Sequence, residues 1–260
     1  MPYAGGVLSP LIIVLLSLAA FAAGLVDAIG GGGGLITLPA LLAAGFPPHF
    51  ALGTNKGQAV FGTATSLATF WRHGGIDRER APMAFAGGLI GSAAGALGVL
   101  AMSPGPLRPL VVVLLIIAAA FVLARRDLTP RAPHLRLAPR AAKVALVIIA
   151  VALGAYDGFF GPGTGSMLII AFSVVLGDGL TRASGNAKVV NLASNMAAFA
   201  LFAARGTIHW PVVLPMALAN ITGAAVGTRL ALRGGDRFVR VAVLVAVSAA
   251  VIKLSLDLRH

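Results

Sequence analysis

The sequence predicts an all-α polytopic membrane protein with two repeated halves, each holding a broken or half-length helix led by a glycine-rich turn. Three observations predict this fold: the composition, the length of the apolar blocks and an internal repeat. Hydrophobic residues make up 58% of the 260 residues, charged residues make up 11%, and the mean hydropathy is +0.94. Soluble domains carry about a quarter charged residues. The 33 glycines and 15 prolines suit packed membrane helices, which tolerate both residue types.

Six apolar blocks are long enough to predict membrane-spanning helices, and they lie at 7–28, 81–102, 107–124, 144–160, 211–230 and 238–256. The first is taken as a mature helix, because residues 1–8 lack the Lys or Arg that begins a secretory signal. Two further blocks, at 57–71 and 186–204, are apolar with polar insertions. The blocks at 31–45 and 163–177 are short, and about 15 helical residues span only about 22 Å of a core of about 30 Å. We expect these two to be half-helices, re-entrant loops or broken spans.

An internal repeat relates the two halves. A shift of 132 positions places residues 31–97 on residues 163–229 without a gap, and Lys56 then falls on Lys188. A chain rich in Ala and Gly aligns easily with itself, but a lysine pair inside apolar sequence and the shared glycine-rich entries favour a duplication. The predicted organisation is a first transmembrane repeat at 1–124, a basic cytoplasmic linker at 125–143 and a second transmembrane repeat at 144–260.

The positive charges predict how the halves are oriented. If both short segments cross the membrane, each half has five crossings and the halves are inverted. The cytoplasmic loops would then be 72–80, 125–143, 178–187 and 229–240, with 14 Lys or Arg inside, 4 outside and both termini outside. If the short segments re-enter, the halves run parallel and the tally is 11 against 7. The inverted arrangement fits better. The net charge of +12 is therefore a topology signal for a lipid bilayer, and no nucleic-acid partner is predicted.

The two aligned lysines are the first candidates for a binding site. Lys188 lies eight residues beyond Leu180 in a largely apolar stretch, so it is expected below the membrane surface. A charge in the bilayer core costs at least about 2.5–3.5 kcal/mol and usually faces a partner or a wet cavity. The alternative for Lys56 is that its side chain reaches up to the membrane interface.

Polar side chains surround both lysines. The candidates are Thr54, Asn55, Asn186, Asn191 and Asn195. Asn191 and Asn195 follow Lys188 at spacings of three and seven residues, so all three share one face of a helix. An ammonium and amide donors on one face suit an oxyanion. The alternative is that the asparagines bond between helices as packing contacts.

Two glycine-rich turns precede the short apolar segments. Residues 30–34 are five glycines, and residues 161–166 read Gly-Pro-Gly-Thr-Gly-Ser. Free N–H groups and the positive dipole end at a helix start attract anions, and glycine allows close approach to the backbone. We therefore expect an anion to contact Gly33, Gly34, Gly163, Thr164 and Gly165. Close helix packing through small residues is the alternative.

Asp27 and Asp157 each precede one of these turns, although a two-residue offset separates them from exact repeat register. A buried carboxylate can carry a proton, cap a half-helix or neutralise a lysine. We treat both as candidates for proton coupling. The chain has no cysteine, and its five histidines lack metal-ligand spacing, so neither a metal nor a cofactor is predicted. No nucleophile and base are arranged for catalysis, so an enzyme is not predicted.

Paired motifs in both halves resemble the sulfite exporter TauE/SafE family over nearly the whole chain. They are Gly-Gly-Gly-Gly-Leu-Ile-Thr-Leu-Pro-Ala-Leu at 31–41, Gly-Thr-Asn-Lys at 53–56, Trp-Arg-His-Gly-Gly-Ile-Asp at 71–77, Gly-Phe-Phe-Gly-Pro-Gly-Thr-Gly at 158–165 and Gly-Asn-Ala-Lys-Val-Val-Asn at 185–191. The resemblance implies a multi-pass carrier in the bacterial inner membrane for sulfite, sulfoacetate or related sulfonates. Second halves similar to the family often have Gly-Thr where this chain has Gly185-Asn186, a difference that bears on substrate choice.

The leading functional hypothesis is a secondary transporter that moves a small anion by alternating access, with one half rocking against the other and protons as a candidate coupling ion. No ATPase motif is present, so an ion gradient or the gradient of the anion would drive it. An anion channel with the same basic site is the alternative. A membrane-embedded enzyme lacks a catalytic constellation, and a purely structural subunit leaves the embedded lysines unexplained. The sequence does not define the oligomeric state.

Overall fold

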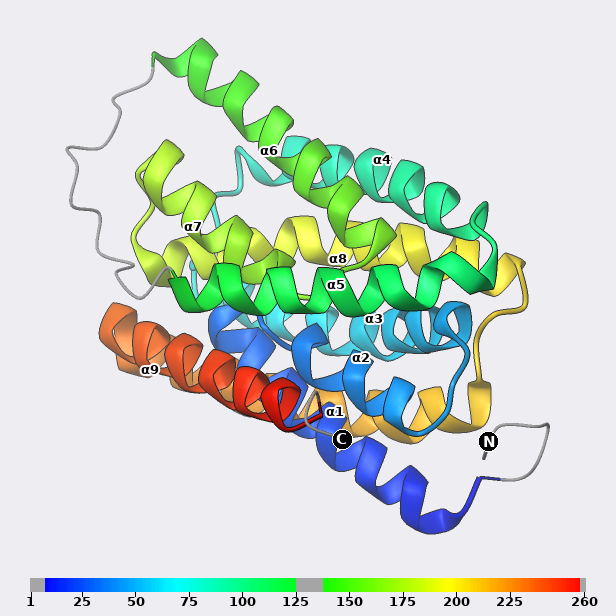
Figure 1. Ribbon diagram of the computed structural model, residues 1–260. Coiled ribbons are helices and arrows are strands. Elements are labelled where there is room, and N and C mark those ends of the chain that lie inside the picture. Colours follow the sequence, from blue (N-terminus) through cyan, green and yellow to red (C-terminus); the bar gives the residue numbers. More distant parts are fainter. Residues whose placement is uncertain (1–7, 125–137, 258–260) are drawn as a thin grey trace.

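The protein folds as a bundle of helices in which segments from both halves of the chain alternate (Figure 1). The structure, a computed structural model, describes residues 8–124 and 138–257. For residues 119, 122–124 and 235–257 it describes the backbone only. The predicted linker therefore lies mostly outside the described residues, except that its last five residues already belong to a helix.

Nine helices form in these two ranges, with no strand among them. In the first half they are α1 (Pro10–Gly30), α2 (Gly34–Ala43), α3 (Pro48–Arg72), α4 (Ala81–Leu100) and α5 (Pro104–Ala124). In the second half they are α6 (Pro139–Phe159), α7 (Thr164–Leu176), α8 (Leu180–Ala204) and α9 (Trp210–Asp257). The prediction of an all-helical membrane protein is confirmed. Proline in the first turn begins α1, α3, α4 and α6, where its missing N–H is not needed.

The predicted loop at 229–240 is wrong. One continuous helix, α9, covers both predicted blocks at 211–230 and 238–256 together with the segment between them. Figure 1 shows the red C-terminal part of α9 running back beside its orange part, so the chain reverses within the helix assignment. Gly234 and Gly235 lie in this region, and adjacent small residues are a common cause of a sharp kink.

Five of the described helices are long and apolar enough to cross a membrane. They are Pro10–Gly30, Ala81–Leu100, Pro139–Phe159, Leu180–Ala204 and the segment Trp210–Gly234 of α9. The short helices α2 and α7 have 10 and 13 residues, about 15 and 20 Å at 1.5 Å per residue. Both therefore have the half-helix length that the sequence predicted. The chain is a multi-pass membrane protein.

Each half packs its first helix against the fourth helix of the other half. The most extensive contacts are α1 with α9 and α6 with α4. In both helix pairs the backbones come close together at glycines, where any larger side chain would clash with the facing helix. An added Cβ would lie 2.1 Å from Val151 O at Gly91, 1.9 Å from Ala155 O at Gly95, 2.1 Å from Phe21 O at Gly223 and 2.3 Å from Leu25 O at Gly227. These glycines are repeat partners, so the same close contact forms twice.

The contacts divide the helices into two bundles that differ from the two halves of the sequence. The first bundle contains α1, α2, α3, α5 and the described part of α9, and the second contains α4, α6, α7 and α8. The long helices α3 and α8 lie side by side where the bundles meet. In Figure 1 α3 and α8 run in opposite directions across the view.

Candidate functional site

The two glycine-rich turns meet at the centre of the bundle. The amide of Ser166 donates to the main-chain oxygen of Gly31 at 3.0 Å, and its hydroxyl donates to the oxygen of Gly30 at 2.7 Å. Gly31 has φ 74°, and an added Cβ would lie 2.2 Å from the carbonyl carbon of Gly165. Only glycine fits both this backbone conformation and this contact. The turns therefore bring the starts of α2 and α7 next to each other.

Lys56 of α3 forms an ion pair with Asp157 of α6. Its Nζ lies 2.8 Å from Asp157 Oδ1 and donates a second hydrogen bond to Asn195 Oδ1 at 3.1 Å. The hydroxyl of Ser194 donates to the other carboxylate oxygen of Asp157. The Lys56 side chain is only 2% exposed, so the alternative in which it reaches the membrane interface is not what the structure shows.

Lys188 of α8 forms the matching ion pair with Asp27 of α1. The distance from Nζ to Asp27 Oδ2 is 2.8 Å, and Nζ also donates to the main-chain oxygen of Asp27. Lys188 is completely buried, whereas the Asp27 side chain is 26% exposed. Each lysine thus neutralises the aspartate of the other half, which was one of the three roles considered for these carboxylates.

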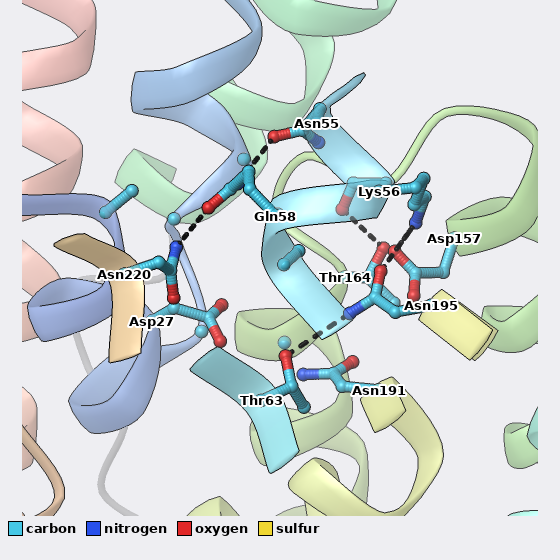
Figure 2. A pocket seen from close by; sticks show the side chains of 18 residues that line it. Asp27, Asn55, Lys56, Gln58, Thr63, Asp157, Thr164, Asn191, Asn195 and Asn220 are labelled. Atoms are coloured by element: carbon cyan, nitrogen blue, oxygen red, sulfur yellow. Dashed lines mark hydrogen bonds and ion pairs between the residues drawn. The ribbon is translucent and has the colours of Figure 1, made fainter. Parts of the chain in front are cut away.

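A polar cavity lies between the two bundles at the crossing of the turns (Figure 2). It leaves about 40 Å³ for the centres of water molecules, which is room for about three waters. Eleven of the predicted site residues line it: Asp27, Gly33, Gly34, Asn55, Lys56, Asp157, Gly163, Thr164, Gly165, Asn191 and Asn195. Figure 2 shows Lys56, Asp157 and Asn195 converging on one wall.

A chain of amide side chains forms another wall. Thr37 Oγ1 donates to Asn55 Oδ1 at 2.5 Å, and Gln58 Nε2 donates to the same oxygen at 3.2 Å. Asn220 Nδ2 from α9 donates to Gln58 Oε1 at 2.5 Å. All four side chains are buried. The carbonyl oxygens of Asn55 and Gln58 therefore accept hydrogen bonds within this wall, and Gln58 and Asn220 each use one N–H group to donate them.

Asn191 and Asn195 both reach the cavity from α8, as their shared helix face predicted. Asn195 Nδ2 donates to Thr63 Oγ1 at 3.3 Å, while its oxygen accepts from Lys56. Asn191 Oδ1 is buried without a hydrogen-bond partner among the described residues. A buried polar atom without a partner is uncommon, and in a cavity wall it points to an occupant such as water or substrate.

Three predicted site residues do not line the cavity. Lys188 is fully buried in its ion pair with Asp27 and is not part of the cavity wall. Thr54 Oγ1 accepts a hydrogen bond from the amide of His209 at 3.2 Å, and Asn186 Oδ1 accepts one from the amide of Asp77 at 2.8 Å. The shift of 132 positions places Thr54 on Asn186 and Asp77 on His209. The two hydrogen bonds are therefore the same contact, made once in each half. Both belong to the ends of the bundle and not to its centre.

The sequence prediction omitted Gln58, Thr63 and Asn220, which also line the cavity. Gln58 and Thr63 lie in the same polar helix as Lys56 and follow it by two and seven residues. Asn220 is the single amide in the apolar block at 211–230 and could have been found by that property. Only the fold shows that it meets Gln58. Among the described residues, no three His, Asp or Glu side chains come together in a way that could hold a metal ion.

An ion-pair cluster joins the two bundles at one end. Arg80 contacts Asp77 at 2.6 Å and Asp178 at 2.9 Å, and Arg182 lies 3.4 Å from Asp77. Burial alone would raise the pKa of Asp77, but hydrogen bonds from Arg80 and the charges of Arg80 and Arg182 hold that pKa below its usual value. At the repeat-related position the other end has aromatic packing, where the rings of Phe46 and His209 lie 5.4 Å apart.

Similarity to known proteins agrees with this geometry. The chain is 36% identical over 253 residues to the probable membrane transporter protein ORF9 of a Sinorhizobium species. The aligned region covers 96% of this chain and 94% of that protein. It is 35% identical to a probable membrane transporter protein of Haemophilus influenzae over 90% of this chain and 91% of that protein. It is 34% identical to the probable membrane transporter protein YfcA of Escherichia coli K12 over 96% of this chain and 91% of that protein.

No solved structure matches the chain. The family described as sulfite exporter TauE/SafE matches residues 16–254, which is nearly the whole chain. The relatives and the family are named for transport and not for catalysis. A polar cavity lined by a buried lysine inside a multi-pass helical bundle fits that description, and the chain belongs to the sulfite exporter TauE/SafE family of membrane transporters.

Proposed function

We propose that this protein is a secondary transporter that moves a small sulfur-containing or organic anion across the bacterial inner membrane by alternating access. Sulfite, sulfoacetate and related sulfonates are the anions that the family name and the donor set favour. The observation that carries the proposal is the central cavity, which presents the Lys56 ammonium and the amide wall to the same small space. An ion gradient or the gradient of the anion would drive transport.

The depth of the lysines supports a site near the membrane midplane. Lys56 lies eight residues into α3 and Lys188 eight residues into α8, about 12 Å from each helix start at 1.5 Å per residue. A hydrocarbon core is about 30 Å thick, so a helix that begins near the membrane surface would carry its lysine well below that surface. Substrate sites of secondary transporters with repeated halves and broken helices lie at this depth, at the interface of the repeats.

The opposite directions of α3 and α8 in Figure 1 support halves that are inserted in opposite senses. The excess of Lys and Arg in the loops assigned to the cytoplasm favours the same arrangement. Halves related in this way could exchange roles when the site changes the side to which it opens. That is the geometric requirement of alternating access.

The moving units would be the two bundles and not the two halves of the sequence. Each first helix packs on the fourth helix of the other half, so the halves cannot separate as bodies. Lys56 and Asp27 belong to the bundle of α1, α2, α3, α5 and α9, whereas Asp157 and Lys188 belong to that of α4, α6, α7 and α8. Both ion pairs therefore cross the boundary, where a rocking motion would change their geometry.

The test is uptake of labelled sulfite and sulfoacetate into proteoliposomes, measured with and without the unlabelled anion inside. A carrier shows saturable uptake that is accelerated by internal anion. Uptake that rises linearly with concentration and ignores internal anion would show a channel instead. Absence of uptake of both anions by correctly folded protein would reject this substrate class.

A further inference from the structure

Four charged side chains meet at the crossing of the two bundles, and their charges cancel. Lys56 and Lys188 carry two positive charges, and Asp27 and Asp157 carry two negative charges. The other charged side chains that the structure describes do not line the cavity. An anion that entered alone would leave this buried site with a net negative charge, which an interior of low dielectric opposes. The site therefore has to gain a positive charge when it gains an anion.

Of the two lysines, only Lys56 lines the cavity and can contact an anion there. Lys188 is completely buried and is held by both the carboxylate and the main-chain oxygen of Asp27. Lys56 lines the cavity, and its partners are Asp157 Oδ1 at 2.8 Å and Asn195 Oδ1 at 3.1 Å. The anion must therefore compete with the Asp157 carboxylate for the ammonium of Lys56.

Asp157 is well placed to become a neutral carboxylic acid without moving. Its second oxygen contacts the hydroxyl of Ser194, which can donate to a carboxylate and can accept from a carboxylic acid by rotation of its hydrogen. A protonated Asp157 could thus keep one hydrogen bond while it releases Lys56. The other carboxylate, Asp27, faces the cavity from α1 but remains paired with Lys188.

We propose that each monovalent anion binds together with one proton, so that transport is electrically neutral. The anion pairs with the Lys56 ammonium, and the proton converts the Asp157 carboxylate to the acid, so the charge of the site remains zero. The negative charge of Asp27 on the cavity wall opposes a divalent anion unless a second proton enters. This inference rests on the proposed function and adds the stoichiometry and the proton site.

The experiment measures labelled sulfite uptake into proteoliposomes, corrected for protein-free liposomes, under either a pH gradient or a membrane potential set by potassium and valinomycin. Both sides are kept acidic enough for sulfite to be mainly the monovalent hydrogensulfite ion. Coupling to one proton gives about tenfold accumulation for an inside-alkaline gradient of one pH unit, because one pH unit is worth a factor of ten per proton. A potential of 100 mV gives no accumulation if transport is neutral, but about 50-fold accumulation if one net charge crosses.

Two matched variants locate the proton site. Asp157→Asn should retain exchange of internal for external anion, lose accumulation driven by the pH gradient and gain accumulation driven by the potential. Glu79→Gln makes the same type of chemical change at an exposed carboxylate outside the cavity and should retain accumulation driven by the pH gradient. The wild-type measurement needs no variant, so it tests neutrality even where a variant fails to fold.

The outcomes separate the two proposals. Absence of saturable exchange in the wild type would overturn the proposed function and this inference with it. Saturable exchange that follows the potential at equal pH would overturn the inference alone. Accumulation driven by the pH gradient that persists in Asp157→Asn would place the proton elsewhere and also overturn it.

Discussion

The pairs Lys56–Asp157 and Lys188–Asp27 occupy repeat-related places but have different surroundings. Both have an Nζ to carboxylate distance of 2.8 Å. Lys56 faces the cavity, whereas Lys188 is closed off behind Asp27. Both pairs therefore hold opposite charges together at the crossing, but only one of the two lysines lines the cavity.

The amide wall shows the same asymmetry. Asn55 and Gln58 fall on Ala187 and Val190 in the second half, which have no side-chain hydrogen-bonding group. Asn220, which completes the wall, falls on Gly88 of the first half. The amide wall is therefore not repeated on the other side of the crossing, where Asn191 and Asn195 line the cavity instead.

Replacement of Lys56 is expected to have the largest effect. Among the described side chains of the cavity wall, Lys56 carries the only ammonium, so Lys56→Met should abolish saturable anion uptake. The measurement is the uptake of labelled sulfite and sulfoacetate into proteoliposomes. Because the single variant leaves Asp157 buried without its partner, the double variant Lys56→Met/Asp157→Asn serves as a control for folding. Saturable uptake by the well-folded double variant would contradict the assignment of Lys56 to the site.

Replacement of Lys188 should instead act mainly on stability. Lys188→Met leaves the Asp27 carboxylate unpaired, and breaking one partner of a buried ion pair costs about 3–5 kcal/mol. Thermal unfolding in detergent should show a clear drop in the midpoint. The double variant Lys188→Met/Asp27→Asn should recover most of that loss and retain saturable uptake. If uptake is lost in the stable double variant, the two pairs are functionally equivalent and the comparison fails.

The glycine contacts between first and fourth helices are expected to be equivalent in the two halves. Gly95→Ala and Gly227→Ala each force a methyl group into the backbone of the facing helix, and overpacking of this kind costs about 1–3 kcal/mol. Gly105→Ala is the matched control, because an added Cβ there meets no atom within 4 Å. Similar decreases in thermal stability for the first two variants and none for the control are expected. A decrease in only one half would show that the interlocked packing is not symmetric.

The two ends of the bundle should differ slightly in their response to acid. The pKa of Asp77 is below its usual value of 3.8, so its ion pairs stabilise the folded state above that pH and are lost as the pH falls through the lowered value. Exposed pairs contribute less than about 1 kcal/mol. Asp77→Asn should therefore reduce the loss of thermal stability between pH 5 and pH 3 by a small amount. An equal loss in both proteins would show that this end is held by other contacts.

Much of the fold followed from the sequence because membrane helices and repeats have direct signatures. Apolar blocks and glycine-rich turns predicted nearly all helices, including the short α2 and α7. The segment 229–240 was predicted as a loop but is assigned as helix, which charge and hydropathy do not show. The alignment of Lys56 with Lys188 identified two of the four central charges correctly.

The site itself depended on contacts between distant segments. Spacing alone could not show that each lysine pairs with the aspartate of the other half, since that depends on how α3 and α8 cross. Thr54 and Asn186 were included because they lie beside the lysines in sequence. Each instead accepts a hydrogen bond from the main chain of a loop at an end of the bundle, which spacing does not show.

The packing of α1 against α9 also has a consequence for biosynthesis. Gly30 and Trp210 are separated by about 180 residues, so the first helix is made long before its main packing partner. At about 5–20 residues per second, synthesis of the intervening chain takes about 10–40 s. During that interval the contact face of α1, with Asp27 near its end, has neither α9 nor Lys188 to cover it. The nascent chain must therefore hold an unpaired carboxylate at the membrane until α8 arrives, and the last helices to emerge complete the fold that the first one begins.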